Sequence, residues 1–181
     1  MIYVVIGILA LLIIYIISSY NGLVSRRNKV KVCWSQMDIQ LKRRFDLIPN
    51  LVNTVKGYTQ YEAETLEKVV EARSKFMKAS SPEEAMKANG ELTQELSRLA
   101  VVVERYPNLK ASENYKALQN QLVETENKIS FSRQFYSDTV MNYNNYVQSF
   151  PSNIIASMFN FKEAAYFETS KSERENIEVK L

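Results

Sequence analysis

The sequence predicts an all-α protein: an N-terminal single transmembrane helix, then an up-and-down antiparallel four-helix bundle. Three observations predict this fold. Residues 1–17 contain no charged side chain. In the rest of the chain, apolar residues recur at spacings of three and four, which is the period of a helix. The 181 residues include only four glycines and four prolines, and so few chain breakers favour long helices over a many-turned β-sandwich.

Composition excludes several classes of chemistry. The chain has no histidine and one cysteine, Cys33. Ser-His-Asp catalysis, His-ligated zinc sites and intrachain disulfides are therefore ruled out. The formal net charge is only +3, which is too small for a nucleic-acid-binding protein. We therefore expect a protein that is not an enzyme and has no catalytic residues, cofactor or metal site.

Residues 1–22 form the predicted transmembrane anchor. About 17–20 apolar residues suffice for a helix to cross the ~30 Å hydrocarbon core of a bilayer. A buried core helix would carry a polar stripe, which residues 1–17 lack. A cleaved signal peptide would need a basic start and small residues at a cleavage site, and Ser18-Ser19-Tyr20 matches poorly. The pattern thus favours an uncleaved anchor in the lipid bilayer.

The charged residues after this anchor predict its orientation. Arg26, Arg27, Lys29 and Lys31 come first, and the first acidic residue is Asp38. Basic residues flanking a membrane helix favour the cytoplasmic side. We therefore expect a single-pass protein of the cell membrane with its N-terminus outside and its C-terminal domain in the cytoplasm.

The predicted bundle covers residues 23–168. Its first apolar series runs from Val30 to Phe76 in the heptad pattern typical of a coiled coil, and Arg44 interrupts it. Pro49 also lies inside this series, so the helix either kinks there or ends near residues 43–44 and restarts after Asp46. A straight helix over 24–78 would be about 80 Å long. This length favours two helices; a kink alone would leave three long helices.

The later boundaries have clear local signals. Ser81, Pro82 and Glu84 form a capping box that predicts the start of a helix ending near Arg105. After a short connection at 106–111, a last long helix is predicted from Ser112 until Pro151. Every seventh residue of it is apolar or aromatic: Tyr115, Leu122, Ile129, Tyr136, Tyr143 and Phe150.

Two segments follow this last helix. Residues 154–161 are apolar and are predicted to be half helix and half loop. In an up-and-down bundle this segment returns to the membrane end. Residues 169–181 are polar and charged and are predicted to form a frayed tail.

The residues also resemble a known family. The motifs are YNGLV at 20–24, RNKV at 27–30, WSQMDIQLKRRFDLIPNLV at 34–52, VKGY at 55–58, YPNLKA at 106–111, TENKI at 125–129 and YFE at 166–168. They resemble the LemA family over nearly the whole chain. The resemblance implies a bacterial single-pass membrane protein with a cytoplasmic helical bundle and no established catalytic residues. Some similar proteins are linked to building intracellular membrane compartments, which suggests scaffolding.

This chain departs from the family pattern at four positions. Tyr61 stands where histidine is common, Cys33 where alanine is common, and Ala165 replaces a frequent proline. Asn160 stands where glycine is usual. Asparagine tolerates the left-handed backbone better than most residues, so we expect the turn there to survive.

Two groups of charged residues are candidates for interaction. Lys42, Arg43 and Arg44, with Asp46, could form a docking or anionic-lipid patch, or simply a solvated helix end. Lipid contact is favoured for the four basic residues at 26–31, because they lie nearest the bilayer.

Tyr143, Asn144 and Tyr146 form a further candidate cluster, either as a recognition surface or as the packed end of the bundle. Trp34 and Met37 are expected in the core. Cys33 is expected to be a small packed side chain. Six carboxylates are expected to form ion pairs on helix surfaces rather than a metal site: Glu62, Glu64, Glu67, Glu71, Glu124 and Glu126.

Two functions from different classes remain. The first is a membrane-anchored scaffold or adaptor that binds unknown membrane or cytosolic proteins, or a second copy of itself as a homo-oligomer. The alternative is a membrane-remodelling or lipid-surface-binding protein, in which residues 26–31 and 154–161 press on the bilayer.

Overall fold

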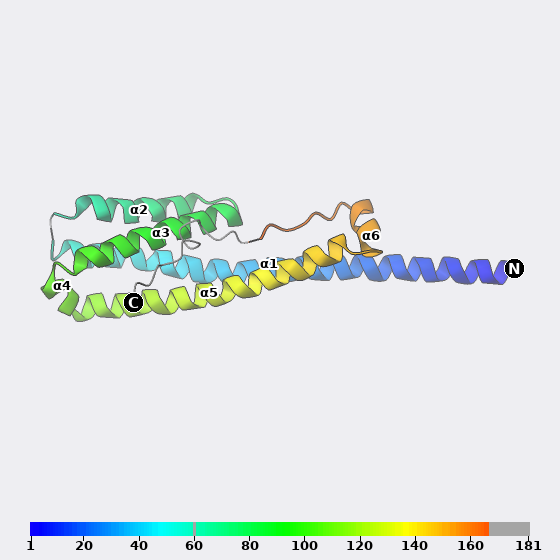
Figure 1. Ribbon diagram of the computed structural model, residues 1–181, viewed down its shortest axis with the longest axis horizontal. Coiled ribbons are helices and arrows are strands. Elements are labelled where there is room, and N and C mark those ends of the chain that lie inside the picture. Colours follow the sequence, from blue (N-terminus) through cyan, green and yellow to red (C-terminus); the bar gives the residue numbers. More distant parts are fainter. Residues whose placement is uncertain (60, 167–181) are drawn as a thin grey trace, which may run out of the picture. The chain divides into compact units, whose positions relative to one another are not determined.

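The computed structural model describes residues 1–59 and 61–166, and these residues form helices without any strand. The elements are α1 (Ile2–Lys56), α2 (Ala63–Lys78), α3 (Pro82–Val103), α4 (Pro107–Ala111), α5 (Glu113–Gln148) and α6 (Ser152–Met158) (Figure 1). The prediction of an all-α fold is confirmed. The tail predicted at 169–181 lies outside the described residues.

The described residues divide into two compact units. Unit 1 comprises residues 1–36 and 132–166, and unit 2 comprises residues 37–131. The long helices α1 and α5 each contribute to both units. Each unit has its own packing and is described by itself.

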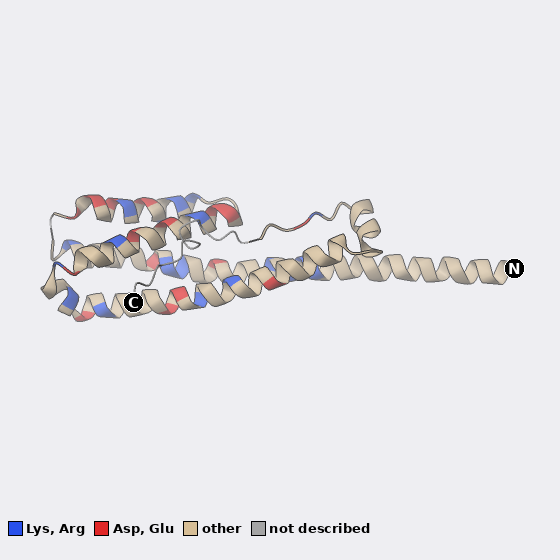
Figure 2. Cartoon of the chain, in the orientation of Figure 1, with Lys and Arg blue, Asp and Glu red and all other residues tan. Residues whose placement is uncertain are grey.

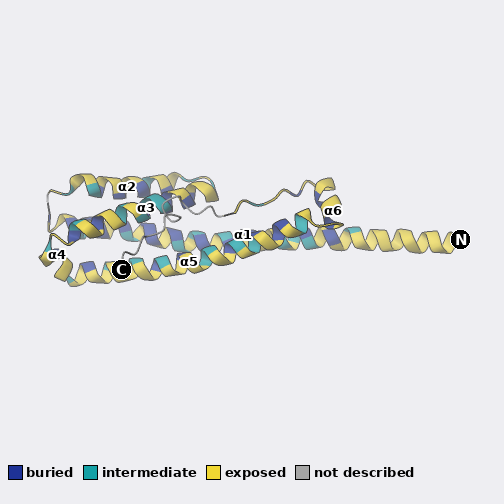
Figure 3. Cartoon of the chain, in the orientation of Figure 1, coloured by how far each residue is buried: buried dark blue, intermediate teal, exposed yellow. Residues whose placement is uncertain are grey.

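The first part of α1 meets the requirements of a membrane span. A window of 18 residues within α1 has a mean hydropathy of 2.7. Figure 2 shows no charged residue near the N-terminus, and Figure 3 shows an exposed helix there. Residues 1–15 are all exposed, so no side of the helix is covered. Apolar residues that are exposed on all sides of a helix indicate a lipid environment rather than a protein core.

The helix break predicted near residues 43–44 is wrong, because α1 continues through Pro49 to Lys56. Proline lacks an N–H, so the carbonyl of Phe45, four residues earlier, has no helical partner. Arg73 of α2 fills this gap, since its Nε donates a hydrogen bond of 3.2 Å to the Phe45 carbonyl. The chain breaks instead between Lys56 and Ala63, so four long helices are still formed.

The core of unit 2 confirms most of the heptad pattern. Met37, Phe45 and Ile48 of α1 are fully buried, with Val69 of α2 and Leu92 of α3. The rings of Phe45 and Phe76 stack with their centroids 4.0 Å apart, which joins α1 to α2. Figure 3 shows such buried positions on the α1, α2 and α3 ribbons.

The capping box predicted at the start of α3 is confirmed with one change. The Glu84 N–H donates to Ser81 Oγ at 3.2 Å. The Glu84 carboxylate accepts from the Ser80 N–H at 2.7 Å, where a standard box would use the N–H of Ser81. Both contacts satisfy polar groups at the helix start and fix α3 to begin at Pro82.

Helix α5 confirms the prediction of a last long helix, but Phe150, the last predicted heptad position, is not buried. Tyr115, Ile129, Tyr136 and Tyr143 are buried. Phe150 is 80% exposed, because α5 ends at Gln148 and the chain turns before Pro151. Phe150 therefore does not belong to the core.

In unit 1 the end of α5 and helix α6 pack against α1. The Tyr20 ring lies edge-on to Phe159, with centroids 4.9 Å apart, and to Phe161, at 5.7 Å. As predicted, the segment at 154–161 is half helix and half loop. It includes Asn160 with a φ of 55°, the left-handed conformation that asparagine tolerates. The predicted return of this segment to the end of the apolar helix is consistent with the Tyr20 contacts.

Candidate functional site

The four basic residues after the apolar segment lie on α1 in unit 1. The Arg26 guanidinium lies 3.9 Å from the centroid of the Tyr146 ring, and its Nη1 donates to the Gly22 carbonyl at 3.3 Å. The Arg27 guanidinium lies 4.9 Å from the Phe161 ring. Lys29 and Lys31 are exposed. Two of the four cations are thus held by aromatic rings.

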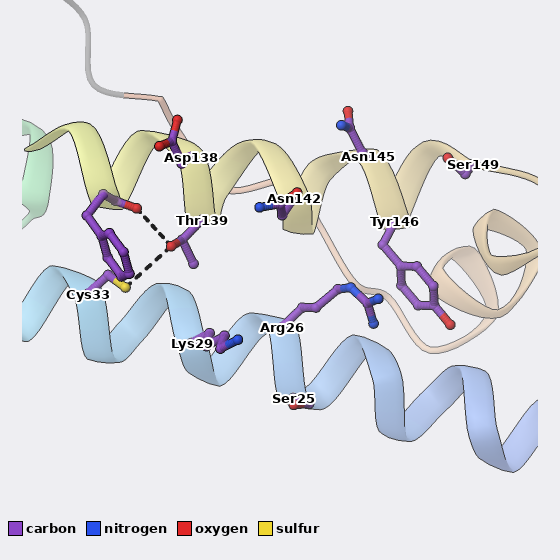
Figure 4. A pocket seen from close by; sticks show the side chains of 11 residues that line it. Ser25, Arg26, Lys29, Cys33, Asp138, Thr139, Asn142, Asn145, Tyr146 and Ser149 are labelled. Atoms are coloured by element: carbon purple, nitrogen blue, oxygen red, sulfur yellow. Dashed lines mark hydrogen bonds between the residues drawn. The ribbon is translucent and has the colours of Figure 1, made fainter.

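A groove of about 670 Å³ lies between α1 and α5 in this unit (Figure 4). At one end Cys33 Sγ and Thr139 Oγ1 are 3.4 Å apart, and Cys33 is buried as predicted. The lining residues come from α1 (Ser25, Arg26, Lys29, Cys33) and from α5 (Phe135, Asp138, Thr139, Asn142, Asn145, Tyr146, Ser149). The cations of this groove were among the predicted interaction residues, but most of the lining residues on α5 were not. The sequence does contain a signal for these α5 residues. They are spaced by three and four, at positions 135, 139, 142, 146 and 149, and therefore lie on one face of the helix.

Tyr143 and Asn144 lie inside unit 1 rather than on a recognition surface. They are 2% and 1% exposed. The Tyr143 hydroxyl donates to the Lys162 carbonyl at 2.8 Å. Burial raises the pKa of this phenol above its ordinary value, and the positive charge of Arg27 acts in the opposite direction. Only Tyr146, which is half-buried, reaches the groove.

Asn144 binds the backbone of the segment that follows α6. Its Nδ2 donates to the Ala164 carbonyl and its Oδ1 accepts from the Ala164 N–H, both at 2.9 Å. This pairing satisfies both backbone groups of one residue, as a neighbouring strand would. Asn144 therefore holds residues 161–165 against α5.

We expect Asn144→Ala to release this segment, because one side chain provides both hydrogen bonds of Ala164. The Ala164 amide should then exchange its hydrogen with solvent at least about tenfold faster. Hydrogen-exchange mass spectrometry on the full chain measures this rate. Asn145→Ala, at an exposed neighbour, serves as the control. Equal exchange in both variants would contradict the role of Asn144.

The residues of the second candidate group, at 42–46, differ in their exposure. Lys42, Arg43 and Asp46 are exposed, whereas Arg44 is 4% exposed. Arg44 is therefore not part of a surface patch. Its position in the apolar heptad series was a signal of this burial.

Arg44 is the centre of a polar network in unit 2. Its Nη1 donates to Asn89 Oδ1 at 2.6 Å and to Thr93 Oγ1 at 3.0 Å, and lies 2.6 Å from Glu126 Oε2. Desolvation by burial lowers the pKa of Arg44, and the negative charge of Glu126 partly opposes this. An open pocket of about 240 Å³ lies beside it, with walls formed mostly by apolar residues such as Leu96 and Leu122. The network links α1, α3 and α5.

Several of the carboxylates form the ion pairs expected of them. Glu64, Glu71 and Glu124 pair with the lysine four residues later in the same helix. Glu62 also pairs with Arg105 at 3.1 Å, and Glu126 with Arg44, but these two pairs are not surface pairs, because the side chains of Glu62 and Arg44 are only 12% and 5% exposed. Within residues 1–59 and 61–166, no cluster of three or more acidic or cysteine side chains has the arrangement of a metal site.

Comparison with known proteins finds distant relatives of this chain. The chain is 26% identical to magnetosome protein MamQ 2 of Paramagnetospirillum magneticum, over 82% of this chain and 64% of that protein. It is 25% identical to protein LemA of Metamycoplasma hominis, over 88% of this chain and 73% of that protein. It is also 24% identical to magnetosome protein MamQ of Magnetospirillum gryphiswaldense, over 82% and 64%. The chain thus spans less than two thirds of the length of the magnetosome proteins.

Residues 33–181 match the LemA family. This match covers α1 from Cys33 onward and all the described helices that follow it. The motifs quoted above for the same resemblance lie largely within it, including the run from Trp34 to Val52. The chain belongs to the LemA family.

Proposed function

We propose that this chain is a membrane-anchored helical scaffold or adaptor and not an enzyme. The observation that carries the proposal is the continuity of α1, which runs as one helix from the apolar segment into unit 2. No loop in α1 separates the anchor from the packed helices. A protein built in this way holds a helical surface at a membrane.

The proposed orientation places the N-terminus outside and units 1 and 2 in the cytoplasm. Its support is the series of basic residues at 26–31, before the first acid at Asp38. We expect an alkaline phosphatase fusion at residue 181 to be inactive, because this enzyme needs an oxidising compartment for its disulfides. An active fusion would reverse the orientation.

The proposed partners are membrane or cytosolic proteins, or a second copy of this chain. Unit 2 exposes large apolar side chains that suit such contacts, including Val101 and Phe131, each 72% exposed.

The test is copurification from native membranes. The full chain is compared with a variant in which residues 1–17 are replaced by an unrelated transmembrane helix. Recovery of the same proteins with both would support recognition by the helices outside the membrane. A chain that stayed monomeric and copurified with nothing would contradict the proposal, and partners lost on the swap would place recognition within the bilayer.

A second candidate function is contact with the lipid surface through α6 and its flanks. Phe150, Ile154 and Met158 are 80%, 56% and 60% exposed. Phe159 meanwhile packs on Tyr20, at the end of the apolar segment of α1. Exposed apolar residues at this level can enter the boundary between headgroups and acyl chains.

This contact predicts that a tryptophan at position 154 lies in the bilayer. In a Trp34→Phe background, which removes the single native tryptophan, Ile154→Trp should be quenched by brominated lipids. Val32→Trp is the matched control, because Val32 is also exposed, at 55%, but lies further along α1. Equal quenching at both positions would contradict insertion of α6.

A further inference from the structure

We propose that the groove between α1 and α5 binds the phosphate group of an anionic phospholipid at the membrane surface. The proposal rests on the membrane anchoring argued above. It goes beyond that anchoring by assigning a defined ligand site to named residues. The site consists of Arg26 and Lys29 of α1 and the polar side chains that face them, among them Asn142 and Tyr146 of α5.

The groove lies at the level where lipid headgroups are found. Residues 1–20 of a helix extend over about 30 Å, the thickness of the hydrocarbon core, so Tyr20 marks its edge. The backbone of Arg26 lies about 9 Å further along the helix. Its Nη1, however, bonds to the Gly22 carbonyl at 3.3 Å, one turn closer to the membrane. The guanidinium thus snorkels back into the headgroup layer.

The Arg26 guanidinium is held in place by the groove itself. It lies 3.9 Å from the Tyr146 ring, which fixes its plane while leaving its edge free. Gly22 makes room for this arrangement, because a Cβ there would lie 3.0 Å from the Tyr146 hydroxyl and 3.1 Å from Arg26 Nη1. A guanidinium has five N–H donors, and within the described residues Arg26 uses them for one hydrogen bond, to Gly22. Donors suited to a phosphate are left over.

The charges of the groove favour an anion. Lys29 lies one turn after Arg26, and neither cation forms an ion pair with a carboxylate of the described residues. The single carboxylate in the lining, Asp138, points away from α1 in Figure 4, whereas Arg26 extends between the two helices. Asn142 adds a neutral amide on the α5 side. The volume of about 670 Å³ falls in the range of small-molecule sites.

The neighbouring basic residues provide an internal control. Arg27 and Lys31 carry the same two charges at nearly the same height on α1 but do not line the groove. Diffuse attraction to an anionic leaflet depends on charge and distance. It should therefore fall equally when either pair is neutralised, whereas a defined site depends only on Arg26 and Lys29.

The experiment uses the full chain in nanodiscs of equimolar phosphatidylglycerol and phosphatidylcholine. After release into mild detergent, native mass spectrometry counts the lipids retained by the protein. We expect phosphatidylglycerol to be favoured about tenfold over phosphatidylcholine. Arg26→Gln with Lys29→Gln should abolish this preference, and Arg27→Gln with Lys31→Gln should keep it within about twofold. Equal losses in both double variants would overturn the proposal.

A variant without a charge change tests the site from the opposite helix. Asn142→Leu fills the groove and should also abolish the preference, while Gln134→Leu, which lies on α5 outside the groove, should keep it. Diffuse electrostatic attraction depends on charge, which neither substitution changes, so it would leave the lipid preference of both variants unchanged. An Asn142→Leu chain that kept the wild-type preference would therefore overturn the proposal.

A competition arm distinguishes a lipid from a soluble phosphate. Inorganic phosphate in large excess should not displace phosphatidylglycerol, and full displacement would assign the groove to a soluble ligand and overturn the lipid assignment. The anchoring is tested separately by incorporation into nanodiscs. A chain that incorporates but shows no lipid preference contradicts the groove alone, and a chain that does not incorporate contradicts the anchor as well.

Discussion

Replacing Glu126 with glutamine is expected to lower the free energy of unfolding of unit 2 by about 2 kcal/mol, because the buried charge of Arg44 loses its counterion, while the 41% exposure of the Glu126 side chain keeps the loss below that of a fully buried pair. The side chain of Arg44 is only 5% exposed. Its charge would stay buried, with Asn89 and Thr93 as its neutral acceptors. An arginine cannot escape this cost by losing its proton.

Replacing Arg44, the other partner of the pair, should lower the free energy of unfolding less. The Glu126 side chain is 41% exposed, so its carboxylate can turn to water when Arg44 is replaced. In Arg44→Met the new side chain also fills the space of the old one with apolar atoms, and we expect a loss of about 1–2 kcal/mol. The double variant Arg44→Met with Glu126→Met should be close to the single Arg44→Met variant, because no buried charge is left.

Urea unfolding of the full chain in detergent, followed by circular dichroism, measures these differences. Glu124→Gln is the matched control, since it removes an exposed pair with Lys128 and should cost less than about 0.5 kcal/mol. A larger loss for Arg44→Met than for Glu126→Gln would show that the packing of Arg44, rather than its buried charge, determines the stability of this region.

The boundaries that sequence analysis found are those set by local chemistry. Ser81, Pro82 and Glu84 fix the start of α3 through contacts among residues 80–84. Pro151 likewise lies just after the end of α5. Such signals involve neighbours in the sequence, so they can be interpreted before the fold is known.

The helix break that was wrongly predicted before Pro49 is prevented by a residue distant in the sequence. Pro49 leaves the Phe45 carbonyl without a helical partner, and Arg73 of α2 provides one. No sequence feature near Pro49 predicts this contact. Continuation of α1 through the proline is therefore a property of the packed bundle and not of local propensity.

The candidate site was found only in part for a similar reason. The basic residues at 26–31 are evident from the sequence, but their division into two faces is not. Arg26 and Lys29 face α5, while Arg27 lies on Phe161. That division depends on where α5 and the segment after α6 lie. Polarity placed Arg44 on the surface. For Tyr143 and Asn144 it left a recognition surface and the packed end of the bundle both open, and the heptad spacing of Tyr143 favoured the second, which their burial bears out.

Replacing Phe45 with alanine is expected to have the other large effect, a loss of about 3–5 kcal/mol in the free energy of unfolding. Phe45 is fully buried, and its ring lies nearly parallel to that of Phe76, with an angle of 7° between the planes. The substitution removes this stack and leaves a cavity between α1 and α2. It also loosens the turn whose carbonyl accepts the hydrogen bond from Arg73.

Urea unfolding of the full chain measures the loss, with Phe131→Ala as the control because Phe131 is 72% exposed. The control should change stability by less than about 0.5 kcal/mol. Phe76→Ala and the double variant complete a cycle, and we expect a coupling energy of about 1 kcal/mol between the two rings. If the losses of the two single variants simply add up in the double variant, the stacking of the two rings makes no direct contribution to stability. The passage of α1 through Pro49 would then depend on Arg73 and on burial of the separate rings, and Arg73→Met would be the variant that opens the helix there.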